Sequence, residues 1–431
     1  MCWDSWWSWE WSPCTKVIIV GGSIAGLTLA HCLHRANIDH VVLEKRDEIA
    51  PQEGASIGLW PNGSQLLDQL GLYEELERQT EPLNRFYDNN FGYGIVFMER
   101  QKVLETLYER YPEKSNTHTN KQVVEIRETV DGVCIVTEDG LIHDGSLAVG
   151  RMADQDPDHI RAKRSEEMTA QFACVFGISG AIDGLRSGEH FYVYGEGISF
   201  MIRKMDRKYS YPDIPRFSTK DAADLCTSQF GHVRITGDVC IRDLWEDRLF
   251  GSMTAMEEGI SEMMHHGRIV LIGNAARKGT KAIHTPMTLN LGQGANSAME
   301  DAAVLSTILN RLLKTRTTKC QPSDHEINIV LTEFQESRYT RTSALYKRSR
   351  LTVRLQSRDD PAKVFLGRYI LPYIRAYSLY MVTKMVADGA TVGFLPTPGR
   401  SNHGWAKYRT KSLQETRLAR KQFDVQDDRD V

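Results

Sequence analysis

The sequence predicts an α/β fold that combines a parallel sheet with a second, mostly β domain and a helical C-terminal region. Three observations support this fold class. An apolar run at 16–20 leads through a glycine pair into apolar residues at helical spacing. Short strand-like runs, separated by turns that contain glycine and proline, occupy about 170–262. Stretches of helical character, rich in Arg, Lys and Tyr, extend from Thr332.

The first elements are a strand, a tight turn and a helix. Lys16–Val20 is a short apolar run that ends at a glycine pair, and a second apolar run, Val41–Leu43, ends at Glu44. The segment has the length of about 30 residues that a parallel crossover connection needs, so it predicts one βαβ unit. The helix between the two strands is indicated by apolar residues at helical spacing, namely Ile24, Leu27, Ala30 and Leu33.

Further along the chain, local patterns predict a hairpin and a second α/β piece. Val123–Arg127 and Val133–Thr137 flank a turn and predict the hairpin, with another turn at 138–140. A buried strand is expected at Arg268–Ile272, and a helix from about Gln293 to Leu312 follows it after a loop. We expect this second piece to pack on the first.

Composition argues against several classes of function. The chain of 431 residues has 53 basic and 56 acidic residues and a net charge of -3, so we expect no nucleic acid partner. The eight cysteines contain no CxxC pair, which disfavours a disulfide framework or a zinc site. His265 and His266 lack metal-ligand spacing, and no metal is expected.

The first fifteen residues form a tryptophan-rich leader that we separate from the fold. It carries five of the eight tryptophans, together with Asp4 and Glu10. No basic segment precedes an apolar run, so a secretory signal is not expected. A tryptophan cluster can lie at a membrane interface, but a disordered leader is the favoured interpretation, because Lys16 begins the first recognisable element.

Gly21, Ser23 and Gly26 occupy the key positions of a GxGxxG pattern. The first glycine makes a tight turn, the small middle residue lets the backbone approach a pyrophosphate, and the third lets helix and strand pack closely. This motif alone is a weak signal. Glu44 strengthens it, because an acidic side chain at the end of the second strand accepts hydrogen bonds from adenosine ribose hydroxyls. Together they predict a Rossmann-type dinucleotide-binding domain.

Three further segments carry a family resemblance: GASIGLWPNG at 54–63, ERQ at 99–101, and LGQGAN at 291–296 with EDAA at 300–303. With the first motif, the chain resembles the group A flavin-dependent monooxygenases, and most of all the fungal FAD-dependent epoxidases of meroterpenoid and indole-diterpene pathways. The phrases ACVFGIS at 173–179 and YSYPDIPRF at 209–217 strengthen this narrower resemblance. It extends from about residue 16 to residue 400.

The resemblance implies that FAD is the cofactor and NAD(P)H the electron donor. It places the LGQGAN turn where its backbone N–H groups face the flavin N1 and O2 atoms, which gain negative charge on reduction. Arg100 would pair with the pyrophosphate or the ribityl side; without the other motifs it is equally well a solvated surface arginine. The residues implied to contact FAD are Glu44, Gly58, Arg100, Gly292, Gly294 and Ala295.

The catalytic tyrosine of the family matches Tyr194, with Tyr192 as the alternative. A strand tyrosine that only packs is an equally good interpretation.

The chain also departs from the family. Relatives have an Asp-Gly motif soon after a Val-Gly pair, but here Gly150 continues directly into Arg151, so we interpret the segment as deleted. Relatives have an aspartate that binds the ribityl chain, and this chain has Asn274 at that position. Asparagine lacks the charge-assisted hydrogen bond of the carboxylate, a loss of about 1 kcal/mol.

Other departures are an insertion at 279–286 and trimmed stretches near 89–91 and 200–202. The implied function is a FAD-dependent monooxygenase that uses NAD(P)H and O2 to epoxidise the alkene of a prenylated or terpenoid small molecule. Aromatic hydroxylation by the same flavin class is one alternative, and a catalytically impaired flavoprotein-like remnant is another. The departures favour the impaired protein, whereas the intact Glu44, Arg100 and 292–294 turn favour an active one.

The expected organisation is a leader at 1–15, an FAD-binding domain at 16–165 and 266–345, a β-rich substrate domain at 166–265 and a helical region at 346–431. Val364–Phe394 is apolar, but charged residues interrupt it, and a span needs about 20 uninterrupted apolar residues. We therefore expect an intracellular protein, either cytoplasmic or bound peripherally to a membrane surface. A soluble helical pair that covers the FAD domain is the alternative.

Overall fold

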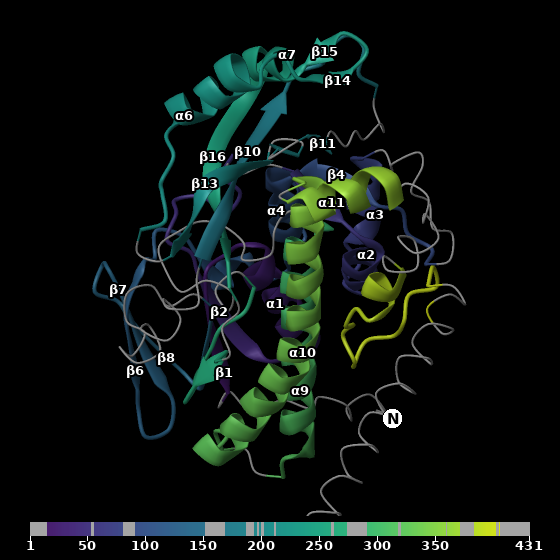
Figure 1. Cartoon of the computed structure of the whole chain (residues 1–431). Helices are drawn as coiled ribbons and strands as arrows, with labels where there is room; N and C mark the ends of the chain where they lie inside the picture. Colours follow the sequence, from purple (N-terminus) through teal and green to yellow (C-terminus); the bar gives the residue numbers. More distant parts are fainter. Residues whose placement is uncertain are drawn as a thin grey trace, which may run out of the picture.

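The structure is a computed structural model, and a parallel sheet with helices packed against it forms its centre (Figure 1). It describes residues 15–52, 56–80, 91–150, 169–186, 194–195, 198–199, 202–210, 213–259, 263–273, 291–317, 320–358, 360–370, 383–401 and 405. Residues 1–14 of the leader, Asn274, Tyr192, the start of the interpreted deletion at Arg151 and the insertion at 279–286 lie outside the described residues.

The central sheet is built on the predicted βαβ unit. β1 (Lys16–Val20) and β2 (Asp39–Leu43) pair in parallel and are joined by α1 (Ile24–Arg35). The strand order is β17-β18-β9-β1-β2-β5, and β17 alone is antiparallel to its neighbour among these described strands. The parallel strands therefore end at one common edge, where open α/β sheets bind ligands. The other strands are β5 (Thr117–His118), β9 (Leu147–Gly150), β17 (His265–His266) and β18 (Ile269–Val270).

The second domain is an antiparallel sheet in the order β11-β12-β13-β10-β16, with short helices at one side (Figure 1). Ala173 and Val175 of its interior strand β10 pack on the helices, as alternation along a strand requires. The strands are β10 (Thr169–Ser179), β11 (Tyr194–Gly195), β12 (Ile198–Ser199), β13 (Ile202–Ser210) and β16 (Arg248–Glu258). The helical segments are α6 (Thr219–Asp224), the π-helical turn η2 (Leu225–Gln229) and α7 (Ile241–Glu246).

Smaller elements surround the two sheets. The hairpin prediction is confirmed by β6 and β7, with Glu128 opposite Val133, and β8 extends it to a three-stranded sheet. The strands are β3 (Ser56–Leu59), β4 (Val96–Glu99), β6 (Val123–Glu128), β7 (Val133–Thr137), β8 (Ile142–Gly145), β14 (Arg234–Thr236) and β15 (Val239–Cys240). The helices are α2 (Pro61–Gln69), α3 (Tyr73–Arg78), α4 (Arg100–Glu109) and the 3-10 turn η1 (Lys114–Asn116).

Two long helices complete the core beside the parallel sheet. α9 (Gly294–Thr315) packs between α1 and α10 (Asp324–Gln356), which is followed by α11 (Pro361–Phe365) and the π-helical turn η4 (Leu366–Ile370). The predicted helical onset at Thr332 is too late, because Ser323 and Glu326 form a capping box that starts α10 earlier. At 33 residues, α10 is about 50 Å long and contacts β17 of the first sheet and β12 of the second. Within the described residues, no helix is both long and apolar enough to span a membrane.

Two histidines are buried behind the parallel sheet. His31 on α1 donates from Nε2 to the carbonyl of Leu107 at 2.8 Å, and His40 on β2 accepts from the hydroxyl of Tyr111. Burial, opposed by the Leu107 hydrogen bond, lowers the pKa of His31 to about 4, and burial also lowers the pKa of His40. Both imidazoles are therefore neutral in the folded protein at neutral pH.

We predict that His31 contributes to acid destabilisation. Its folded pKa of about 4 lies below the ordinary histidine value of 6.5, so the unfolded chain binds the proton first, and stability falls as the pH drops from about 6.5 to 4. The loss amounts to about 3 kcal/mol over that window. Urea unfolding at pH 7 and pH 4.5 should show a smaller pH dependence for His31→Gln, while the exposed control His232→Gln keeps the wild-type dependence. An unchanged dependence in His31→Gln would contradict this assignment.

Candidate functional site

The turn after β1 has the backbone that the glycine motif predicts. Gly21 has φ +111°, a conformation that favours glycine, and a Cβ there would meet nothing within 4 Å, so open space adjoins the turn. A Cβ on Gly26 would lie 2.0 Å from the carbonyl oxygen of Gly21, so only glycine lets α1 approach the turn. α1 has no side-chain cap and no acidic residue in its first turn, which leaves its N-terminal N–H groups available to an anion.

Glu44 lies at the end of β2, beside this turn, and is buried. Its Oε2 accepts from the backbone N–H of Gly22 at 2.7 Å, and its Oε1 accepts from the backbone N–H and the guanidinium of Arg46 at 3.1 and 3.2 Å. The first bond fixes the carboxylate against the turn. The Arg46 side chain is partly exposed, so a ribose hydroxyl can replace its contact with Oε1.

Arg100 reaches the same turn from another element. It is the first residue of α4, directly after β4, and its Nη2 donates to Oγ of Ser23 at 3.0 Å. The guanidinium therefore lies beside the uncapped N-terminus of α1, where two sources of positive potential reinforce each other. The expected pairing of Arg100 with the pyrophosphate or the ribityl side stays a prediction.

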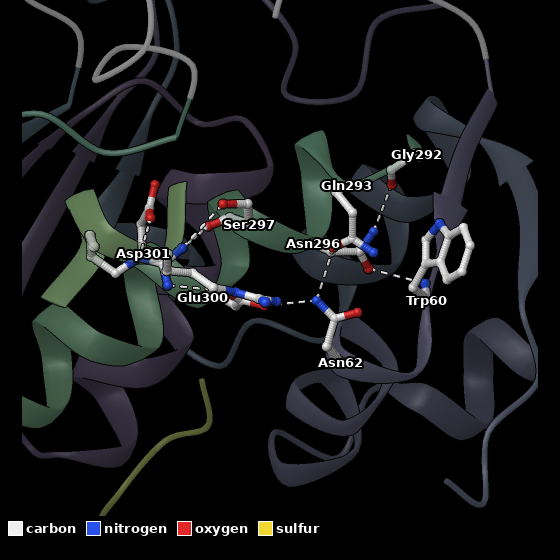
Figure 2. A network of polar contacts seen from close by, with 10 residues as sticks. Trp60, Asn62, Gly292, Gln293, Asn296, Ser297, Glu300 and Asp301 are labelled. Carbon is white, nitrogen blue, oxygen red and sulfur yellow. Dashed lines mark hydrogen bonds and ion pairs between the residues drawn. The ribbon is translucent and has the colours of Figure 1, made fainter. Parts of the chain in front are cut away.

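A second glycine turn precedes α9 and is tied to the segment after β3. Asn296 donates from Nδ2 to the carbonyls of Gly58 and Gly292, both at 2.8 Å, and its Oδ1 accepts from the backbone N–H of Trp60 at 3.1 Å. Gly292 has φ +58°, and a Cβ there would lie 2.8 Å from Nε1 of Trp60. One asparagine thus holds the two predicted FAD-contacting segments against each other (Figure 2).

Behind this turn lies a buried ionic network (Figure 2). Glu300 and Asp301 are both 0% exposed. Glu300 accepts from Asn62, Arg338 and Arg341 at 2.7 to 3.1 Å. Burial by itself would raise the pKa of Glu300, but the charges of Arg341 and Arg338 lower it to about 2, so the carboxylate stays ionised.

Unpartnered donors indicate that a further group belongs beside the second turn. In the part of the chain that the structure describes, Nε1 of Trp60 and Nε2 of Gln293 are buried without a hydrogen-bond partner. Gln293 is the N-cap of α9, whose N-terminus has no side-chain cap and no acidic residue in its first turn. Carbonyl and ring-nitrogen acceptors, such as those of a flavin, fit this set of donors.

Most of the predicted contacts are brought together at the carboxyl edge of the parallel sheet. Glycine turns and polar side chains from β1, β2, β3, α4 and α9 gather there, and their roles in cofactor binding stay predictions. Tyr194 is described by its backbone alone, on the edge strand β11 of the second sheet. The residues placed at the site are Gly21, Ser23, Gly26, Glu44, Gly58, Arg100, Gly292, Gly294 and Ala295.

Sequence reasoning missed the roles of Asn62, Asn296 and Arg338. The two asparagines lie inside quoted motifs, but nothing local reveals that their side chains join the motifs to each other. Arg338 is one of many arginines in α10, and it has no distinguishing sequence signal although it is 1% exposed. Its partners became visible only with the packing of α9 on α10.

These features define the class of protein: a two-domain flavoprotein fold with a dinucleotide site at the carboxyl edge of its parallel sheet. Residues 14–138 match the family described as FAD binding domain. The chain is 45% identical over 437 residues to the FAD-dependent monooxygenase nvfK of Aspergillus novofumigatus, with 91% of both chains covered. It is 45% identical over 451 residues to the FAD-dependent monooxygenase penE of Penicillium thymicola, with 94% of this chain and 93% of that one covered.

The chain belongs to the family of FAD-dependent monooxygenases. Solved structures share its fold at low identity. A variant of Klebsiella pneumoniae HpxO complexed with FAD has a TM-score of 0.63 and 19% identity, over 87% of this chain and 99% of that one. The Diels-Alderase PyrE3 of pyrroindomycin biosynthesis has a TM-score of 0.63 and 21% identity, over 88% and 82%. The second name shows that the fold alone does not fix the reaction.

We predict that Gly26→Ala abolishes tight FAD binding, because its Cβ would collide with the Gly21 carbonyl and displace the turn. The wild-type protein, incubated with FAD and desalted, should be yellow with a flavin absorption band, and the variant should be colourless. Gly399→Ala is the matched control, since a Cβ there meets nothing within 4 Å. Wild-type protein that holds a nicotinamide nucleotide and no flavin would overturn the assignment of this turn to FAD.

Proposed function

We propose that this monooxygenase uses NAD(P)H and O2 to epoxidise the alkene of a prenylated or terpenoid small molecule in fungal secondary metabolism. The main support is the 45% identity to FAD-dependent monooxygenases over nine-tenths of the chain. The segments 173–179 and 209–217 strengthen the narrower resemblance to terpenoid epoxidases. The first lies in β10, and the second begins at the end of β13. These strands are neighbours, with Ala170 opposite Tyr209, so both segments belong to one sheet of the proposed substrate domain.

Bound FAD supplies the hydride acceptor and the centre at which O2 is activated. The Gly21–Gly26 turn, the N-terminus of α1 and Arg100 would hold the pyrophosphate, and Glu44 would bind the adenosine ribose. The N-terminus of α9 would stabilise negative charge at the pyrimidine edge of the flavin. Asn274 would contact the ribityl chain. Tyr194 would act on the substrate side from strand β11.

A second candidate function is an impaired member of the family that binds FAD and turns over slowly. The alignment with nvfK extends over 437 residues, more than the 431 of this whole chain, although 91% of the chain takes part. That relative therefore has residues at positions where this chain has none. This observation supports the interpretation that the Asp-Gly segment and other stretches were deleted. Hydroxylation of an aromatic ring by the same flavin chemistry is the remaining alternative.

We predict that the chain as it stands is a poor catalyst and that Asn274→Asp alone will not restore activity. One regained carboxylate contributes about 1 kcal/mol to ribityl binding, or about fivefold in affinity. A displacement of about 1 Å around the flavin can cost about 100-fold in rate. The FAD dissociation constant, NAD(P)H oxidation and epoxide yield on a prenylated aromatic should therefore be compared in three proteins.

The three proteins are the wild type, Asn274→Asp, and a variant with the Asp-Gly segment reinstated and 279–286 removed. Only the third is expected to epoxidise substantially. Coupled turnover by the wild type would show that the departures are harmless. Full recovery by Asn274→Asp would show that the deletion and the insertion are minor faults. If the third protein binds FAD tightly but hydroxylates the ring, the proposed epoxidation is wrong and aromatic hydroxylation takes its place.

We also propose peripheral association with a membrane surface, supported by exposed apolar residues beyond α10. Phe365 and Tyr369 are each 58% exposed, their rings lie 5.4 Å apart, and Ile370 is exposed next to them. Exposed Arg368 lies among these residues and suits an anionic headgroup. The aromatic rings would enter the interface without spanning the bilayer.

The expected result is that the protein floats with anionic vesicles and is released by carbonate washing. Phe365→Ser combined with Tyr369→Ser should lose most of this binding, while Leu249→Ser, which removes an even more exposed apolar side chain from the second domain, should not. Resistance to carbonate would mean that a segment spans the bilayer. Absence of flotation in the wild type would favour the soluble alternative.

A further inference from the structure

Arg338 is the largest of the fully buried side chains of α10. Its Nε donates to Oδ1 of Asp301 at 2.7 Å and its Nη1 donates to Oε2 of Glu300 at 3.0 Å. Its Nη2 donates to the carbonyl and the hydroxyl of Ser297 at 3.2 and 3.1 Å. All three partners lie in the first turns of α9, so one guanidinium fixes the end of the helix that faces the FAD site.

Each carboxylate that Arg338 contacts uses its other oxygen to hold a different segment of the site. Oδ2 of Asp301 accepts from the backbone N–H of Gly273 at 2.8 Å, in the turn after β18. Oε1 of Glu300 accepts from Asn62 at 2.7 Å, at the start of α2. Gly273 has φ +59° and immediately precedes Asn274, which the family resemblance implies to contact the ribityl chain.

The network therefore connects three backbone segments that lie around the proposed FAD site: the segment after β3, the turn after β18 and the N-terminus of α9. We propose that Arg338 is a positioning residue, which does not touch FAD but holds these three segments at the spacing that FAD binding needs. This inference rests on the proposed FAD site. It assigns a function in cofactor binding to a residue that the family resemblance did not include.

The same helix provides a matched control. Arg354 also makes a two-pronged ion pair with a buried carboxylate, donating to Glu258 of β16 at 2.9 and 2.8 Å. Its partners belong to the sheet of the second domain and include Gln171 on β10. Arg338→Met and Arg354→Met therefore remove the same side chain from the same helix, and each leaves a buried carboxylate with fewer cationic partners. Only the first removes a contact to the FAD-site segments.

The experiment measures the FAD dissociation constant of apoprotein by flavin fluorescence, and the Tm of each protein with and without FAD. Arg338→Met is expected to weaken FAD binding about tenfold. A loss of this size is typical when a residue that orients the ligands of a metal site is replaced, and Arg338 has the same kind of indirect role. The rise in Tm on adding FAD should shrink accordingly. Arg354→Met is expected to lower the Tm with and without FAD by similar amounts, and to leave the dissociation constant within about twofold of the wild-type value.

Asp301→Asn keeps the shape of the side chain and serves if Arg338→Met does not fold. It is expected to weaken FAD binding as well, because one carbonyl oxygen cannot accept from both Gly273 and Arg338 with full strength. Wild-type affinity in a folded Arg338→Met or Asp301→Asn protein would overturn the inference, as would equal weakening by Arg354→Met. Failure of the wild type to bind FAD would instead overturn the proposed function.

Discussion

Two adjacent carboxylates without solvent exposure constrain this structure more than any other feature. Glu300 and Asp301 are consecutive on α9, and burying two such charges is costly unless cations accompany them. Arg338 and Arg341 provide the cations, so α10 must dock on α9 in one register. That docking also packs Leu309 of α9 and Phe334 of α10 into the core beside β1 and β18. The electrostatic requirement and the apolar packing thus select the same arrangement.

The carboxyl edge of the parallel sheet explains why the site lies where it does. β1 ends there in the Gly21 turn, β2 ends at Glu44, and β18 leads into the Gly273 turn. Strand direction alone therefore collects side chains from distant parts of the sequence. The N-termini of α1 and α9 carry no acidic side chain in their first turns, so both contribute positive potential to the proposed FAD site.

The parts of the fold that the sequence predicted well depend on local signals. β1 begins and ends as predicted, and Glu44 was found because the strand that ends there is short and apolar. The start of α10 was misplaced because the Ser323–Glu326 capping box was overlooked in a stretch whose apolar periodicity is weak. The polar contacts inside the site depend on pairs that are distant in the sequence, such as Asn62 with Glu300, 238 residues apart. A single sequence holds no local pattern for such a pair.

Cofactor binding and catalysis respond differently to the departures of this chain from its relatives. The proposed FAD site is distributed over many contacts, in which Glu44, Arg100 and both glycine turns keep the residues that the resemblance predicts, and loss of one charge-assisted bond costs about 1 kcal/mol. Catalysis depends on the position of the reacting atoms, where a shift of about 1 Å has a much larger effect on the rate. Deletions that leave the glycine turns in place therefore damage turnover before they damage binding. A chain that keeps the Arg338 network retains the framework of the cofactor site even where the segments that complete the active site have changed.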